Sequence, residues 1–376
     1  MPRRRSLVGL FAALFAPVAL AADVTVAPAT GDPGIKRIDT IALAPGGHLL
    51  IADGATSRVV VIKTGDTANR LTPDASPKVA NVVHEIAGRL GSADKDVEIA
   101  EMVVNPDTGR SYLLVKKLDE KRNLIVTVDP DGTIAPLDLA KASFVAVKLP
   151  QGAAPANAPR VTEMAWAKDR LVCSARTGEE FASKLMVIPA PLGPDSAANT
   201  ISAETYHVAH GKWETKAPMA ALCPYEENGR LYVVGGFGCT PIVKYPVDTI
   251  KDGAKVKGES MIELGSGNRP LDMFIYTKHG KPSVLVSTFR FHHDRAPMGP
   301  SAYWVCRFDQ SILGSAQTNE KAMRRNVKKP DDSAANVAIA FSGVRHMCKL
   351  DDGRAIVIRE NKDDKAKLDL EVLPLP

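Results

Sequence analysis

Six residues stand at the same place in a repeated sequence unit, and four of them are types that bind metal ions or transfer protons. Each unit is a short apolar segment, a turn containing Gly, Pro or Asp, and a second apolar segment. Alignment of the units gives one column: Thr40, Glu101, Glu163, Met219, Asp272 and His346. Three carboxylates and an imidazole gathered at one place repel one another or lose their charge unless a cation neutralises them.

This column predicts either a divalent cation or pairing with basic side chains. Carboxylate oxygens with one imidazole suit Ca²⁺, Mn²⁺ or Zn²⁺. The predicted ligands are Glu101, Glu163, Asp272 and His346. The alternative is a water-filled funnel in which arginines neutralise the acids. Three arginines lie within three residues of the column: Arg160, Arg269 and Arg345.

A second concentration of reactive side chains follows the fifth unit, in residues 288–298. Long irregular loops on a rigid scaffold are often functional. His292 and His293 are adjacent, so on an extended backbone only one of them would easily enter the funnel. We expect His292 and His346 to be the acid–base residues. The predicted ligand-binding residues are Arg58, Arg269, Arg290, His293, Asp294 and Arg345. In the alternative interpretation the loop packs on its own Phe residues and Asp294 holds a turn.

The elements that would position these residues are short strands. Segments rich in Val, Ile and Leu end at Gly, Pro or Asp-Gly, and helical periodicity is scarce. The units start roughly 50 to 75 residues apart, which is the size of a four-stranded propeller blade. The sequence therefore predicts an all-β fold, a six-bladed β-propeller of four-stranded antiparallel blades. The alternatives are a seven-bladed ring with one degenerate blade or an open sandwich pair.

The sixth unit lacks a fourth strand at the C-terminus, and the N-terminus offers a candidate. Residues 23–26 followed by 29–31 resemble the predicted fourth strands, such as 82–86, 144–147 and 261–264. We expect this N-terminal strand to complete the last blade and close the ring, because closure pairs open sheet edges.

The first 21 residues resemble an export signal. Three arginines precede an apolar stretch that ends in Ala19-Leu20-Ala21, so residues 1–21 are predicted to be removed and 22–376 to form a single domain. Arg4-Arg5 also fits a twin-arginine signal loosely. We expect a periplasmic or secreted monomer without a membrane span. Net charge falls from +5 to +2 on cleavage, so a nucleic-acid partner is not expected.

Five cysteines leave at least one thiol outside any intrachain disulfide. A disulfide between Cys239 and Cys306 is one candidate pairing. No haem motif is present, and three tryptophans are too few for the repeats of quinoprotein propellers. Haem and quinone chemistry are therefore disfavoured.

The layout resembles the group of six-bladed propellers that includes gluconolactonases and paraoxonases. The resemblance implies a divalent cation at the channel mouth held by Glu101, Glu163 and Asp272, which would polarise a lactone or ester carbonyl while His292 or His346 activates water. The chain differs in lacking a Glu-Gly-Pro in its first unit and an Asn in the column. The sequence shows no combination of a nucleophile, a general base and a residue that orients the base. We therefore rank first a non-catalytic protein that binds a small molecule or another protein at its top face, and second a metal-dependent lactonase or esterase.

Overall fold

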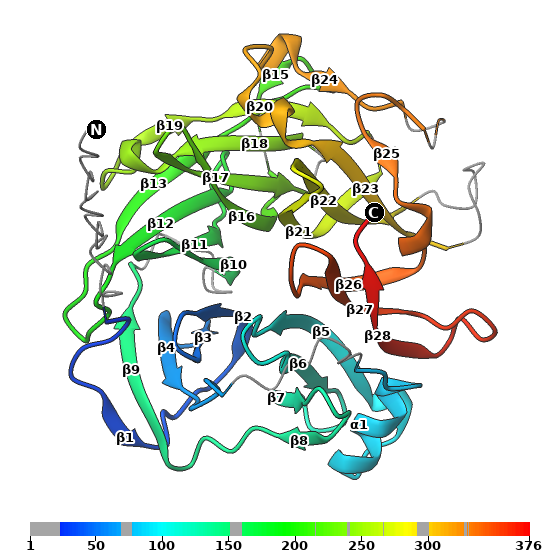
Figure 1. The fold of residues 1–376 in the computed structure, drawn as a ribbon. Coiled ribbons are helices and arrows are strands. Elements are labelled where there is room, and N and C mark those ends of the chain that lie inside the picture. The colour runs from blue at the N-terminus through cyan, green and yellow to red at the C-terminus, as the bar shows by residue number, and fades with distance from the viewer. Residues whose placement is uncertain are drawn as a thin grey trace, which may run out of the picture.

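Six β-sheets stand around a central axis like the blades of a propeller (Figure 1). The computed structural model describes residues 23–68, 77–150, 160–214, 216–238, 241–265, 267–291, 301–326, 329 and 331–376. The prediction of an all-β six-bladed propeller is confirmed. The predicted signal, residues 1–21, lies outside the described residues. Among the residues described, no helix is long and apolar enough to cross a bilayer.

Blades 1 and 2 come first in the chain. From the axis outwards, blade 1 consists of β2 (Ile38–Ala44), β3 (His48–Asp53), β4 (Arg58–Lys63), β9 (Ala142–Lys148) and β1 (Ala29–Gly31). Blade 2 consists of β5 (Val97–Val104), β6 (Ser111–Lys117), β7 (Arg122–Val128) and β8 (Ile134–Pro136). In both blades every neighbouring pair is antiparallel, as predicted.

Blades 3 and 4 each carry a parallel strand at the outer edge. Blade 3 consists of β10 (Arg160–Ala167), β11 (Arg170–Arg176), β12 (Ser183–Pro189), β13 (Asn199–Glu204) and β19 (Lys255–Lys257). Blade 4 consists of β16 (Met219–Glu227), β17 (Arg230–Phe237), β18 (Pro241–Pro246), β20 (Glu259–Glu263) and β24 (Met323–Arg324). A two-stranded hairpin joins them: β14 (Tyr206–His207) and β15 (Lys212–Trp213).

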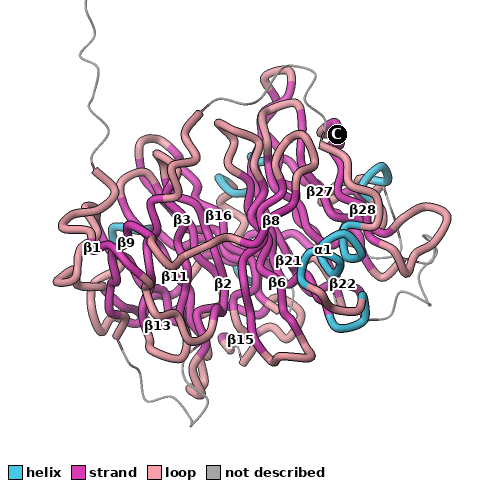
Figure 2. Tube along the Cα trace, turned by 90° about the horizontal axis from the view of Figure 1, so that it is seen from below, coloured by secondary structure: helices cyan, strands magenta, loops and turns pink. Residues whose placement is uncertain are grey.

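The last two blades are smaller. Blade 5 consists of β21 (Asn268–Lys278), β22 (Lys281–Arg290), β23 (Tyr303–Asp309) and β25 (Asn336–Val337). Blade 6 consists of β26 (Val344–Lys349), β27 (Arg354–Glu360) and β28 (Leu368–Pro374). Turned by 90°, the molecule shows strands through its interior and loops around them (Figure 2).

One predicted fourth strand is a helix. Residues 82–86 begin α1 (Val82–Leu90), which buries Val82, Ile86 and Ala87 on one face and ends at Gly91 in the left-handed conformation. The β-branched pair Val82-Val83 favoured a strand, but apolar residues four apart and a glycine cap specify a helix. The short 3₁₀ helices are η1 (Asp94–Asp96), η2 (Val247–Thr249), η4 (Gln310–Gly314), η5 (Asn319–Lys321) and η6 (Ile339–Phe341).

The order of blades around the ring differs from their order in the chain. Blade 1 lies between blades 2 and 3, and blade 2 closes against blade 6 (Figure 1). Apolar clusters join Ile51 of blade 1 with Leu114 of blade 2, and Val61 of blade 1 with Met164 of blade 3. After blade 2, the chain runs back along the outside of blade 1 as β9 before it enters blade 3.

The predicted closure by the N-terminal strand is wrong. β1 pairs with β9 of blade 1, and Val24 and Val26 exchange backbone hydrogen bonds with Leu192 beside blade 3. The outer edge of blade 6 is met instead by Val79, which exchanges two backbone hydrogen bonds of 2.8 and 2.9 Å with Leu370. The outer strand of blade 1, β9, has a free edge, and β1 pairs with that edge. The outer edge of blade 6 is covered by α1.

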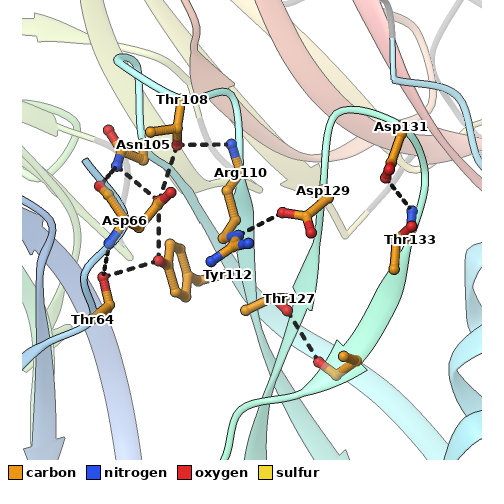
Figure 3. A network of polar contacts seen from close by, with 11 residues as sticks. Thr64, Asp66, Asn105, Thr108, Arg110, Tyr112, Thr127, Asp129, Asp131 and Thr133 are labelled. Atoms are coloured by element: carbon orange, nitrogen blue, oxygen red, sulfur yellow. Dashed lines mark hydrogen bonds and ion pairs between the residues drawn. The ribbon is translucent and has the colours of Figure 1, made fainter. Parts of the chain in front are cut away.

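A buried polar network joins blades 1 and 2 (Figure 3). One oxygen of Asp66, a residue only 4% exposed, accepts hydrogen bonds from Asn105 Nδ2 at 2.8 Å and from Thr108 Oγ1 and Tyr112 OH at 3.0 Å. Asp66 follows β4, whereas its three donors come from blade 2. Nearby, Arg110 pairs with Asp129. The network fixes two blades that are neighbours in the ring.

Candidate functional site

A cavity of about 320 Å³ lies on the axis, where the inner strands of all six blades meet. All six residues of the sequence column line it: Thr40, Glu101, Glu163, Met219, Asp272 and His346. The structure therefore gathers residues that lie up to 306 positions apart in the chain. Five further polar residues that the sequence analysis did not single out also line the cavity: Arg37, Asp39, Lys116, Asn123 and Thr162.

A β-bulge in each inner strand turns these side chains towards the axis. In every blade the pairing of the first strand with the second slips beside the cavity. A bulge adds unpaired backbone and re-aims the next side chain. Thr40, Glu101, Glu163 and His346 each come directly after the slip. In blades 4 and 5 the residue chosen by the sequence alignment is not the one that follows the slip. Met219 precedes the slip in blade 4, and Asp272 lies within the slip in blade 5.

Glu101 connects blade 2 to blade 1 across the cavity wall. One of its oxygens accepts from Thr40 Oγ1 at 2.8 Å and the other from the Ile41 amide at 3.0 Å. Burial raises the pKa of Glu101 to about 8, against these two hydrogen bonds, and the charge of Asp272 raises it further. At neutral pH the folded protein therefore keeps a proton on this carboxyl group.

Asp272 connects blade 5 to blade 6. Its Oδ2 accepts from Ser287 Oγ and from the Met347 amide, both at 3.1 Å. Burial raises the pKa of Asp272, while the nearby His346 lowers it. His346 Nε2 lies 3.2 Å from the Ile99 carbonyl oxygen, to which it must donate, so Nδ1 carries the lone pair whenever the ring is neutral.

Glu163 is the least compensated of the three acids. Within the described part of the chain, no hydrogen bond or ion pair holds its carboxylate. Burial raises the pKa of Glu163 well above its usual value, and the charges of Glu101 and Asp272 raise it further. Glu163 is therefore the carboxyl group that gains most from a cation brought into the cavity.

Neutralisation by arginine is not what the described residues show. None of the three acids has a Lys or Arg nitrogen within 4.0 Å among the side chains described. Arg269 lines the cavity but makes no ion pair with any residue that the structure describes, and Arg345 pairs with Glu360 at 3.5 Å. The Arg160 side chain lies outside the described part of the chain.

The oxygen and nitrogen atoms of the predicted metal set are not preassembled. Among the described residues, the one group of three His, Cys, Asp or Glu ligand atoms within 4.8 Å of one another is His207, His210 and Glu214. A metal ion bound by Glu101, Glu163, Asp272 and His346 would therefore have to draw them together. Metal binding at the axis stays a prediction.

Three of the predicted ligand-binding arginines do not line the axial cavity. Arg58 Nη2 donates to Asp53 Oδ2 at 3.1 Å and to the carbonyls of Pro33 and Gly34 at 2.9 Å, so it holds the segment before β2. Because Arg58 bonds buried groups of its own blade, its contacts are those of a structural residue.

Arg290 and Arg345 lie against aromatic rings. The guanidinium carbon of Arg290 stands 3.1 Å from the centroid of Trp304, and that of Arg345 stands 4.8 Å from the centroid of Tyr303. Burial lowers the pKa of Arg290 to about 10.

The remaining predicted residues, His292, His293 and Asp294, lie outside the described residues. Cys306 carries a free buried thiol, so the candidate disulfide with Cys239 is wrong.

The raised pKa of Glu101 predicts that stability falls with rising pH. The unfolded chain releases this proton near pH 4.5, whereas the folded protein keeps it to about pH 8. Between these values the folded state binds more protons, so the free energy of unfolding should decrease by on the order of a few kcal/mol. In Glu101→Gln the amide oxygen can accept from the Ile41 amide while the amide nitrogen donates to Thr40 Oγ1, so the variant fits the site without a titrating group and should flatten this slope. Urea unfolding at pH 5 to 9 measures it, with exposed Glu98→Gln as control. An unchanged slope in Glu101→Gln would contradict the assignment.

The fold and site together define a six-bladed β-propeller whose axial cavity is lined by both acidic and basic side chains. No family model matches the sequence, and no curated protein matches it either. Similar solved structures include the PQQ-bound aldose sugar dehydrogenase of Streptomyces coelicolor (13% identity, TM-score 0.39, covering 94% of this chain and 100% of that one). Another is an exo-1,5-α-L-arabinanase from a bovine ruminal metagenomic library (12% identity, TM-score 0.41, covering 75% and 94%). At these values neither likeness supports an activity for this chain.

Proposed function

We propose that the mature chain is an exported binding protein that takes a small organic cation into the axial cavity. The observation that carries this proposal is the convergence of Glu101, Glu163 and Asp272 on one cavity with no Lys or Arg nitrogen within 4.0 Å among the described residues. Burying such acids together is costly, and a positively charged ligand offsets that cost.

An organic ammonium group fits the site better than a bare ion. A volume of about 320 Å³ admits several non-hydrogen atoms. Val161, Met219 and Leu271 supply apolar walls for methylene groups. An N–H donor needs only one acceptor oxygen at a time, so it does not require the carboxylates to close on a single point.

Binding of such a cation is coupled to proton release. Glu101, whose pKa is raised to about 8, is largely protonated at pH 7. Burial also raises the pKa of Glu163, and each carboxyl group must be ionised to attract the ligand. Affinity therefore increases as the pH rises towards the pKa of Glu101, which is about 8.

Calorimetric titration tests this proposal with 1,4-diaminobutane, Ca²⁺ and Mn²⁺ as probes. We expect the diamine to bind in one equivalent, with proton release that appears as a dependence of the heat on the buffer. Its affinity should be higher at pH 8 than at pH 6. Absence of diamine binding at both pH values would overturn the proposal.

The second candidate is a divalent-metal-dependent lactonase or esterase, and one observation favours it. His346 donates through Nε2, which leaves Nδ1 as a candidate general base in the cavity wall. Turnover of a lactone and an ester panel with and without added Mn²⁺ or Ca²⁺ separates this function from binding alone. Metal-dependent turnover that is lost in His346→Gln would support the hydrolase.

A further inference from the structure

Two histidines and a glutamate meet in the hairpin at the outer edge of blade 4, away from the axis. β14 and β15 form this hairpin, which lies near β20 and β24 (Figure 1). His207 is buried, whereas His210 is exposed and Glu214 is partly exposed. The spacing is His-x₂-His-x₃-Glu, a signal that the column of the repeat does not contain.

The three ligand atoms converge on one point. The Nδ1 atoms of His207 and His210 are 2.8 Å apart, and Glu214 Oε1 lies 3.6 Å from His207 Nδ1. Glu214 Oε1 also contacts His210 Nδ1. Two imidazole nitrogens and a carboxylate oxygen form a donor set that binds divalent transition metals.

Protons alone do not satisfy this arrangement. His210 Nδ1 faces both His207 Nδ1 and Glu214 Oε1. If that nitrogen carries a hydrogen, it has one donor for two acceptors; if it carries a lone pair, it faces the carboxylate with no hydrogen between them. A cation between the three atoms satisfies all of them at once.

The backbone of the hairpin presets these positions. The His207 carbonyl accepts from the amides of His210 at 3.1 Å and Gly211 at 2.9 Å, and Gly211 has a φ of +68° that a glycine adopts without strain. The Glu214 amide donates to the Thr205 carbonyl at 3.1 Å. Tyr206 packs edge-on against Trp213, which anchors the base of the hairpin.

The surroundings resemble the outer shell of a metal site. Lys212 Nζ lies 2.6 Å from Glu214 Oε2, so it leaves Oε1 to face the histidines. Glu263 is 3% exposed, and its Oε2 has no hydrogen-bond partner within the described structure. The charges of Arg324 and, with a smaller effect, His210 lie close to this carboxyl group. A buried acid with an unsatisfied oxygen beside the cluster is a second feature that favours positive charge there.

We propose that His207, His210 and Glu214 bind one divalent first-row transition-metal ion, with Zn²⁺ as the best fit. Three protein ligands leave a fourth position for water, and exposed His210 lets solvent reach it. All three ligands lie within residues 207–214, so the ion cross-links the hairpin internally, a structural role independent of the axial cavity.

Metal titration of the full mature chain tests this site. After treatment with a chelator, the protein should bind one equivalent of Zn²⁺, and Co²⁺ should give the visible absorption of a tetrahedral complex. His210→Ala and Glu214→Gln should each weaken the affinity by at least about 100-fold, because each removes a ligand. Both change side chains at the surface of the hairpin, and their metal-free melting temperatures check that they fold.

Two controls locate the ion. His84→Ala removes an exposed histidine whose one ion pair among the described residues is with Asp94, at 3.0 Å, so the variant should bind Zn²⁺ like the wild type. Glu163→Gln changes the axial cavity and should also leave Zn²⁺ binding intact. The proposal is overturned if the wild type binds no stoichiometric metal, if His210→Ala binds as tightly as the wild type, or if Glu163→Gln alone abolishes binding.

Discussion

Glu163→Gln is expected to weaken binding of 1,4-diaminobutane by about 30- to 1000-fold at pH 8. Removing one member of a desolvated charge pair costs about 2 to 4 kcal/mol, which gives this range. Glu163 lines the cavity without any hydrogen bond or ion pair in the described structure, so its charge is the one that the ligand neutralises most completely. Calorimetric titration of wild type and variant measures the ratio.

A matched control separates this effect from general loss of negative charge. Glu226 is exposed and pairs with Lys168 at 3.3 Å, and neither residue lines the cavity, so Glu226→Gln removes the same charge away from the proposed site. We expect its affinity to stay within about 3-fold of the wild type, because exposed pairs contribute little. Equal losses in Glu226→Gln and Glu163→Gln would show that the diamine binds elsewhere.

Asp66→Ala is expected to lower the free energy of unfolding by about 3 to 5 kcal/mol. The substitution removes the acceptor for Asn105, Thr108 and Tyr112, all of them buried at their polar ends between blades 1 and 2 (Figure 3). A buried donor that loses its acceptor no longer has a hydrogen bond to offset its loss of hydration, so the folded state is destabilised. Urea unfolding followed by intrinsic fluorescence measures the change.

Two further variants test whether the network causes this loss. Asp66→Asn retains one acceptor oxygen, so its cost should be smaller than that of Asp66→Ala. Asp131→Ala removes an exposed side-chain oxygen that accepts from the Thr133 amide at 2.9 Å, and it should cost less than about 1 kcal/mol. A loss below about 1 kcal/mol in Asp66→Ala would contradict the structural role of the network.

The repeated pair of strands and the column of residues on the axis could be predicted from the sequence, because both follow from patterns within a few neighbouring residues. Alternating apolar residues and turn chemistry specify β2 with β3, and the equivalent pair in each other blade. Once six such pairs are aligned, propeller geometry brings Glu101, Glu163 and Asp272 to one cavity. The bulges of blades 4 and 5 displaced the alignment at Met219 and Asp272, because a bulge changes the register without a residue signature.

The outer strands of the blades were predicted less well, because the sheet edges that compete for them belong to segments distant in the chain. Residues 82–86 pack as helix α1 against blade 6, and residues 144–147 form β9 on blade 1 rather than the edge of blade 2. An apolar segment of this length can cover any open sheet edge, and only the three-dimensional neighbours decide which one. The His207, His210 and Glu214 cluster was overlooked for a related reason: it lies outside the repeat, in a hairpin recognisable only after folding.

By itself the sequence determined the class of fold, the number of blades and the identity of the acids on the axis, since periodicity and turn residues act over a few positions. The tertiary structure alone decided the placement of blade 1 between blades 2 and 3, the pairing of the N-terminal strand with β9, and the lack of an ion pair between Glu163 and the described arginine side chains. These outcomes depend on which surfaces bury each other across hundreds of residues, and no local pattern carries that information.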